Sequence, residues 1–332
     1  MTNTDVYYSK AHKSNIKKLI ILSALVFVAA IAYLLIDSKM YNSKLFEFVL
    51  RLRIPTLIVM LIASFAIGSA SIVFQSIINN RIVTPCLLGM NAMYTLVHTA
   101  LVFAAGSASV FVTNINLAFI VDLVVMSVVA TFVYSYLFKK TNHNILYVLL
   151  IGTVLTSFFG SIQSTMIRVM DPNEYDTLLV SLVADFNNVN SDIIVLSLLL
   201  LSALIFFLRK DMALLDVITL GKDQAINLGV EYDKVIRRLL LGVVLCISIA
   251  TAMVGPISFL GLIIANLARQ LLKTYRHTQL IIGASLMGML TIIAGQVIME
   301  HVFSFAVPIS TFITIGGGMY FLYLLLFRKG AC

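Results

Sequence analysis

Long apolar runs separated by short polar segments dominate the chain. A helix needs about 20 apolar residues to cross a bilayer, and ten runs approach or reach that length. They lie at about 19–36, 54–74, 87–105, 117–138, 145–167, 193–208, 239–256, 259–272, 280–303 and 306–327. The run at 259–272 is short for a full crossing. The ~10-residue alternating segments typical of β-barrel strands are absent. The pattern predicts an all-α polytopic membrane protein of about ten transmembrane helices.

Composition agrees with this fold class. The 332 residues are 60% hydrophobic and 11% charged, whereas a soluble domain is about a quarter charged. The three cysteines are scattered and form no cluster with histidine, so we expect no disulfide framework, no metal site and no cofactor. We expect residues 1–332 to form a single transmembrane domain.

The distribution of positive charge predicts the topology. Of the 23 Lys and Arg residues, 18 fall on one side of the ten-span arrangement, if the N-terminus is placed inside. The five on the other side are Lys39, Lys44, Arg51, Arg53 and Arg168. Since cytoplasmic loops are enriched in Lys and Arg, both termini are predicted to be cytoplasmic. The net charge of +8 is spread over span ends rather than gathered in one patch, which argues against nucleic-acid binding.

Catalytic and nucleotide motifs are missing from the sequence. It has no GxxxxGK[ST], HExxH or GxSxG motif, so ATP, if it is used, binds another chain. Few charges lie deep in the spans: Asp122 is near the outer end of the fourth, and Glu300 and His301 are near the outer end of the ninth. Ion-coupled carriers usually place carboxylates at mid-membrane. A transport subunit is therefore favoured over an ion-coupled secondary transporter or a membrane enzyme.

Prolines and glycines mark expected turns. Four prolines are predicted to stand at span ends or re-entrant turns, where a missing N–H is tolerated: Pro55, Pro85, Pro256 and Pro308. Gly255 and Gly261 bracket a tight reversal between the seventh and eighth spans. Gly316 to Gly318, at the middle of the last span, are interpreted as a site of close helix packing.

Two loops are long enough for a function of their own. The outer loop at about 168–192 is acidic, and the inner loop at 209–238 is mixed in charge. Within the inner loop, Ala225 to Gly229 reads as a short helix that ends at glycine. Composition alone leaves two interpretations of this helix open: a connector at the membrane surface, or a docking element for a cytoplasmic partner.

Four segments, in order, resemble one known family. The first is Arg53-Ile54-Pro55-Thr56, preceded by Arg51, and the second is Gln75 followed by the segment from Asn80 through Pro85 to Gly89. The third contains Leu220-Gly221, Ala225 and Leu228-Gly229-Val230, and the fourth is Gly255-Pro256-Ile257-Ser258-Phe259-Leu260-Gly261-Leu262 with Arg269. They resemble the boxes of the iron-siderophore and cobalamin importer permeases (FecCD/BtuC-like), the ten-span membrane subunits of type II ABC importers. Thr56 and Arg81 depart from the family pattern.

The resemblance implies roles and partners. The segment at 220–230 corresponds to the coupling helix, which docks on a cytoplasmic ATPase dimer. Arg51 and Arg53 correspond to arginines that meet an extracytoplasmic siderophore-binding protein, a role that suits the bidentate guanidinium. A second permease chain, identical or different, completes the pathway in the bacterial cytoplasmic membrane. The segments 80–89 and 185–190 look closer to a subgroup that imports catecholate or petrobactin-type ferric siderophores.

Overall fold

The computed structural model describes residues 3–36, 43–106, 108–140, 145–187, 190–304 and 307–327. These residues form helices and loops, with no strand among them. The helices are α1 (Asn3–Leu35), α2 (Ser43–Ile78), η2 (Pro85–Leu88), α3 (Met90–Ala105), α4 (Val110–Thr113), α5 (Ile115–Lys140), α6 (Ile145–Val169), α7 (Pro172–Leu182), α8 (Ser191–Ala213), α9 (Leu215–Ile218), α10 (Lys222–Asn227), α11 (Tyr232–Val254), α12 (Leu260–Leu272), α13 (His277–His301) and α14 (Ile309–Phe327).

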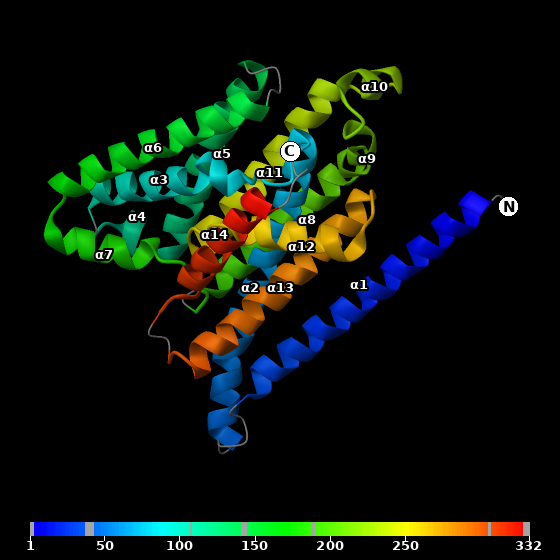
Figure 1. The fold of residues 1–332 in the computed structure, drawn as a ribbon. Helices are drawn as coiled ribbons and strands as arrows, with labels where there is room; N and C mark the ends of the chain where they lie inside the picture. Colours follow the sequence, from blue (N-terminus) through cyan, green and yellow to red (C-terminus); the bar gives the residue numbers. More distant parts are fainter. Residues whose placement is uncertain are drawn as a thin grey trace.

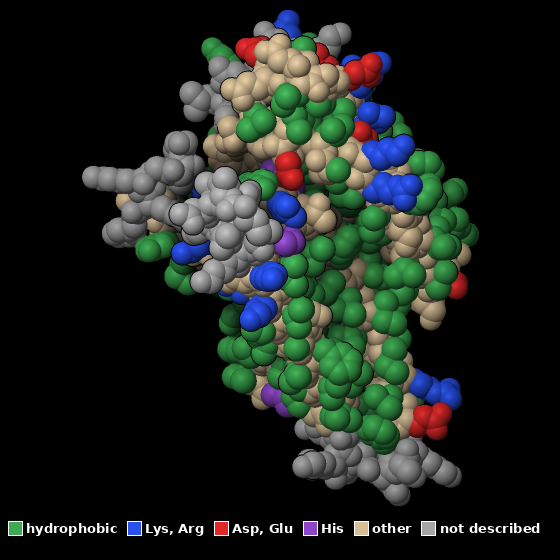
Figure 2. All heavy atoms as spheres, turned by 90° about the vertical axis from the view of Figure 1, so that its right-hand side faces the viewer, with side chains coloured by type: hydrophobic (Ala, Val, Ile, Leu, Met, Phe, Trp, Pro, Cys, Tyr) green, Lys and Arg blue, Asp and Glu red, His purple; other side chains and the backbone are tan. Residues whose placement is uncertain are grey.

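The predicted all-α class is confirmed, and each predicted span coincides with a helix. Among the described residues, seven helices are long and apolar enough to cross a membrane: α1, α2, α5, α6, α8, α11 and α13. The other three predicted spans match the shorter apolar helices α3, α12 and α14. Hydrophobic side chains cover the middle of the face in Figure 2, and Lys and Arg gather above them. A lipid-facing belt of this kind is what a multi-pass protein requires.

Helix α2 is the centre of the bundle, and it corrects one prediction. It packs against α8, α11, α12 and α13 (Figure 1). Pro55 was expected at the start of a span, but α2 begins at Ser43, so Pro55 lies inside the helix. Proline there cannot donate to the carbonyl one turn earlier. The Thr56 hydroxyl, one residue on, donates to the neighbouring Leu52 carbonyl at 3.1 Å, a side-chain hydrogen bond within the same turn.

The first and last helices place the chain's described ends at one end of the bundle, which we call the α10 end. Lys18 Nζ in α1 donates to the carbonyl of Leu271 at the end of α12 (2.8 Å). Gln270 Nε2 donates to the hydroxyl of Tyr320 in α14 (2.9 Å). Helices α1 and α13 run side by side in Figure 1, with α10 at the top. That the α10 end faces the cytoplasm stays a prediction from charge.

The reversal between α11 and α12 lies within the bundle. Helix α12 has 13 residues, so it is ~20 Å long, less than the ~30 Å of a hydrocarbon core. Gly255 has φ +87°, and a β-carbon there would lie 3.0 Å from the Ala184 Cα. The Asp185 N–H donates to the Val254 carbonyl at 2.9 Å. Protein therefore covers the turn that Pro256 follows, as irregular backbone at membrane depth requires.

Candidate functional site

The short helix α10 is closed at its C-terminus by a glycine motif. Gly229 has φ +82°, the left-handed conformation that glycine adopts without strain. The Val230 N–H donates to the Ala225 carbonyl (3.0 Å), and the Gly229 N–H donates to the Ile226 carbonyl (2.9 Å). These two bonds are the Schellman pattern that satisfies the last carbonyls of a helix. Gly221, with φ +109°, stands before the first residue of α10.

One side of α10 faces the bundle, and the other side exposes apolar residues. Ala225 is fully buried, whereas Leu220, Ile226 and Leu228 are 53%, 49% and 64% exposed. Lys222 Nζ lies 3.3 Å from an Asp233 carboxylate oxygen at the start of α11. Three apolar side chains are therefore exposed within nine residues around α10.

Helix α9, just before α10, is fixed to the start of α13. The Asp216 Oδ1 atom lies 2.9 Å from the backbone N of His277 and 2.5 Å from its Nδ1. His277 is the first residue of α13, so the carboxylate both caps that helix and complements its dipole. Leu215 and Ile218 of α9 are buried in the core. The α9–α10 segment is thereby connected to α13.

A polar pocket of about 960 Å³ opens beside this segment. It is lined by the last turn of α2, the following loop, Thr219, the end of α12 and the loop before α13. Three cations line it, Arg81, Arg269 and Lys273, and its described lining contains no carboxylate. The pocket is suited to an anionic or strongly polar ligand.

Several residues of the predicted boxes meet at the wall of this pocket. Gln75 Nε2 donates to the Arg81 carbonyl (2.9 Å), and Arg269 Nε donates to Gln75 Oε1 (3.4 Å). The Asn80 carboxamide oxygen accepts from the Ile82 N–H (2.8 Å), which fixes the turn after α2. Asn266 Nδ2 also donates to the Arg81 carbonyl (3.1 Å). The second and fourth boxes, far apart in sequence, therefore form one structure.

The remaining residues of the second box hold α3 against α6. Pro85 begins η2, and Gly89 follows it with φ +93°. A β-carbon on Gly89 would lie 2.8 Å from the Thr156 hydroxyl, and one on Gly152 would lie 2.5 Å from a Leu88 methyl. This close approach explains the glycines at both positions.

The two arginines expected to contact a binding protein occupy different environments at the opposite end. Arg51 is exposed, with 77% of its side chain accessible, and its Nη2 lies 2.8 Å from Glu47 one turn earlier. Arg53 pairs with Glu300 of α13, and only 11% of its side chain is accessible. Its Nη1 also donates to the carbonyls of Tyr33 (2.7 Å) and Ile36 (2.8 Å) at the end of α1. Arg53 thus connects α1, α2 and α13.

The glycines of the later spans differ in what surrounds them. A β-carbon on Gly261 would lie 2.0 Å from the Ser71 hydroxyl of α2, and one on Gly317 would lie 2.3 Å from the Phe259 Cβ. Of the glycine run at 316–318, Gly317 is thus closely packed, as predicted. For Gly316 and Gly318, no atom of the described residues lies within 4 Å of such a carbon. Pro308 directly precedes α14 and lines a pocket of about 700 Å³ with Asp185 and Gln296.

The buried carboxylate of Asp122 contacts a histidine of another helix. It is 2% exposed, and its Oδ2 lies 2.6 Å from Nδ1 of His98 in α3. The Tyr94 ring stacks on the His98 ring. The pair of His98 and Asp122 joins α3 to α5.

Sequence reasoning missed the partners rather than the boxes. Asp216 and His277 are 61 positions apart in the chain, and Arg53 and Glu300 are 247 positions apart. A single sequence does not reveal such contacts. The acidic outer loop predicted at about 168–192 contains helix α7, which Asp171 caps through the Asn173 N–H and Pro172 begins. That Asp-Pro pair is a helix-start signal.

Comparisons with known proteins agree with this geometry. The model of the FecCD transport family matches residues 14–327. The petrobactin import system permease protein YclO of Bacillus subtilis is 37% identical over 86% of this chain and 91% of its own length. The corresponding protein FatC of Bacillus anthracis is 31% identical over 85% of this chain and 79% of its own length.

A solved structure of a metal-chelate type ABC transporter in an inward-facing conformation shares the fold. It is 20% identical, has a TM-score of 0.79, and covers 95% of this chain and 100% of that chain. The family match spans nearly all described helices, including the boxes at the α10 end. This chain belongs to the FecCD transport family.

Proposed function

We propose that this chain is the permease subunit of an ABC importer that carries a ferric siderophore across the bacterial cytoplasmic membrane. Family membership makes it a multi-pass transport subunit rather than an enzyme, and it implies a separate ATPase and a substrate-binding protein as partners. The single observation that carries the residue-level proposal is α10, a glycine-closed helix with Ile226 exposed on it and Leu220 and Leu228 exposed on either side.

The proposed coupling site is the segment from Leu220 to Val230. Gly221 and Gly229 set the direction of the chain on either side of α10, and Ala225 seats the helix on the bundle. The exposed leucines then provide the apolar contact with an ATPase subunit. Force on α10 reaches α13 through Asp216 and His277, and α13 packs along α2. Transport follows if ATP binding favours one packing of these helices over another.

The polar pocket is our candidate for the inner end of the pathway. Its three cations match the negative charge of a catecholate or carboxylate chelate. The petrobactin permeases among the relatives favour a siderophore of this class. Arg81, which departs from the family pattern, adds one of the three charges.

At the opposite end we assign the two arginines different tasks. The exposed Arg51 is the proposed contact for a carboxylate of the siderophore-binding protein. The shielded Arg53 supports that surface by connecting α1, α2 and α13. A second permease chain is expected to complete the pathway, and the open surface at Gly316 and Gly318 of α14 is the candidate contact.

The test is ATP-dependent uptake of radiolabelled ferric siderophore into membrane vesicles that contain this chain with its ATPase, partner permease and binding protein. The variants Leu228→Asp and Ala225→Asp, on opposite sides of α10, are compared. Leu228→Asp should assemble the transmembrane bundle normally but lose ATPase contact and uptake. Ala225→Asp should disturb the bundle itself, because it buries a charge. Uptake that persists without the ATPase and follows a proton or sodium gradient would replace the importer with a secondary carrier.

A further inference from the structure

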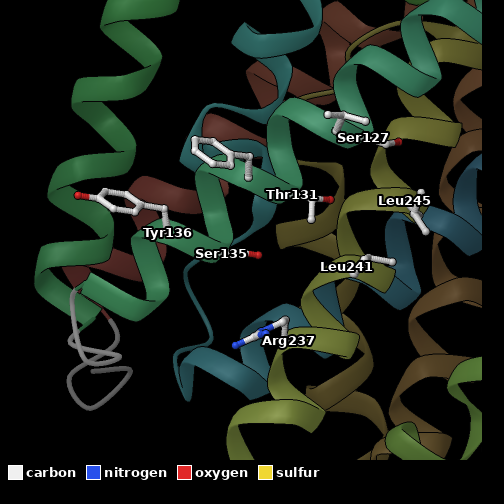
Figure 3. A pocket seen from close by; sticks show the side chains of 9 residues that line it. Ser127, Thr131, Ser135, Tyr136, Arg237, Leu241 and Leu245 are labelled. Carbon is white, nitrogen blue, oxygen red and sulfur yellow. The ribbon is translucent and has the colours of Figure 1, made fainter.

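A groove of about 770 Å³ runs between α5 and α11, away from the coupling segment and the polar pocket. Ser127, Thr131 and Ser135 of α5 recur every fourth residue, so they lie on one face of the helix. Their small side chains leave a channel, and Leu241 and Leu245 of α11 form its opposite wall (Figure 3). The surface of the groove is mainly apolar.

The groove opens sideways within the apolar belt. Val128, Phe132 and Tyr136 on its rim are 64%, 76% and 62% exposed. Helices α5 and α11 are both long and apolar enough to cross a membrane. Large apolar side chains exposed at that depth face lipid or another protein, and an apolar chain can enter such a groove from the bilayer.

A single cation closes the end of the groove nearest α10. Arg237, in the second turn of α11, lines this end, and Figure 3 shows its side chain reaching across below Ser135. Arg237 makes no hydrogen bond or ion pair with any residue that the structure describes. Its neighbour Arg238 points elsewhere and pairs with the buried carboxylate of Asp211 at 3.1 Å. The two adjacent arginines therefore differ in their described partners: Arg238 pairs with Asp211, and Arg237 lines the groove.

We propose that this groove binds one anionic phospholipid, with an acyl chain between α5 and α11 and the phosphate on Arg237. The small stripe of α5 fits an acyl chain, and the guanidinium offers two N–H donors to the phosphate oxygens. The cation lies at the membrane boundary where headgroups lie, on the side that the charge distribution assigns to the cytoplasm. Arg237 lies in the second turn of α11, the helix that follows α10. A lipid bound in the groove would therefore stabilise the start of α11, next to the coupling segment. The proposal is independent of what the chain transports.

Native mass spectrometry of the full-length chain in detergent tests it, with phosphatidylglycerol and phosphatidylcholine as probes. The wild type should retain one phosphatidylglycerol more tightly than phosphatidylcholine. Arg237→Gln should weaken phosphatidylglycerol binding by about fivefold, the equivalent of the ~1 kcal/mol that one basic residue contributes near a membrane surface. Arg209→Gln, which removes an exposed cation of α8 outside this groove and leaves no buried carboxylate unpaired, is the control and should leave the binding unchanged.

A second variant tests the acyl-chain half of the site. Thr131→Phe fills the channel and should lower retention of both lipids, with the melting temperature measured beside it to show that the chain is folded. Equal losses in Arg237→Gln and Arg209→Gln would mean a general surface charge effect and overturn the proposal. Unchanged retention in a folded Thr131→Phe would overturn it too, as would a photo-crosslink from residue 131 to a protein chain instead of lipid.

Discussion

One carboxylate oxygen of Asp216 contacts two nitrogens of His277: Asp216 Oδ1 lies 2.9 Å from the backbone N and 2.5 Å from Nδ1. One residue stands in α9, next to the proposed coupling helix, and the other begins α13. The side chain of His277 is 6% accessible, so water competes little for this contact. The contact connects the α9–α10 segment to α13, a helix of 25 residues.

Replacing Asp216 by Ala should therefore weaken both folding and coupling. The loss of a helix-capping carboxylate costs about 1–2 kcal/mol, and we expect a lower melting temperature with a larger fall in ATP-dependent uptake. Glu231→Ala, at an exposed carboxylate outside the proposed coupling segment, is the control and should change neither. Thermal unfolding and vesicle uptake measured on the same preparations check this. Full uptake by Asp216→Ala would show that α9 does not transmit movement to α13.

Gly229 should accept asparagine but not valine. Its φ of +82° is tolerated by asparagine, whereas a β-branched residue is strained there, at a cost of about 1–2 kcal/mol. No described atom lies within 4 Å of an added β-carbon, so backbone strain rather than a clash separates the two variants. Gly229→Asn should retain most uptake, and Gly229→Val should lose it while the bundle stays folded. Equal uptake by both variants would contradict a role for the Schellman turn.

The two arginines near the start of α2 should give opposite results. Arg53→Gln leaves Glu300 shielded and unpaired, so we expect about 3–5 kcal/mol of destabilisation. Arg51→Gln removes an exposed pair with Glu47 and should cost at most about 0.5 kcal/mol. Unfolding curves test these costs.

Affinity for the siderophore-binding protein, measured by biolayer interferometry, should fall for Arg51→Glu in a folded protein. Unchanged affinity would remove Arg51 from the docking surface.

The fold class and the position of α10 could be predicted because each depends on local sequence. Apolar runs predict helices one at a time, and a glycine after a short amphipathic stretch predicts a helix end. The start of α2 could not be found in this way. Lys44, Glu47, Arg51 and Arg53 lower the hydropathy of residues 43–53, although the backbone continues as one helix through them.

The site was predicted as separate boxes, and their contacts were not. The meeting of Gln75, the Arg81 carbonyl and Arg269 depends on how α2 and α12 pack, which periodicity does not determine. The same holds for Arg53, which a single sequence marks as a charge at a span end. Only the packing of α13 beside α2 brings Glu300 to it.

The packing of α12 on α2 predicts that a substitution at Gly261 destabilises the protein and that a second substitution at Ser71 restores its stability. A β-carbon on Gly261 would lie 2.0 Å from Ser71 Oγ and 3.1 Å from Ser71 Cβ. Gly261→Ala should therefore destabilise the protein by about 1–3 kcal/mol through overpacking. Adding Ser71→Gly removes both atoms and leaves the nearest other contact, Ile67 Cγ2, at an ordinary 3.4 Å. The double variant should recover most of the melting temperature. Gly160→Ala, with no described atom within 4 Å, is the control and should not lower it. If Ser71→Gly restores nothing, the α2–α12 contact is not as close as the structure shows.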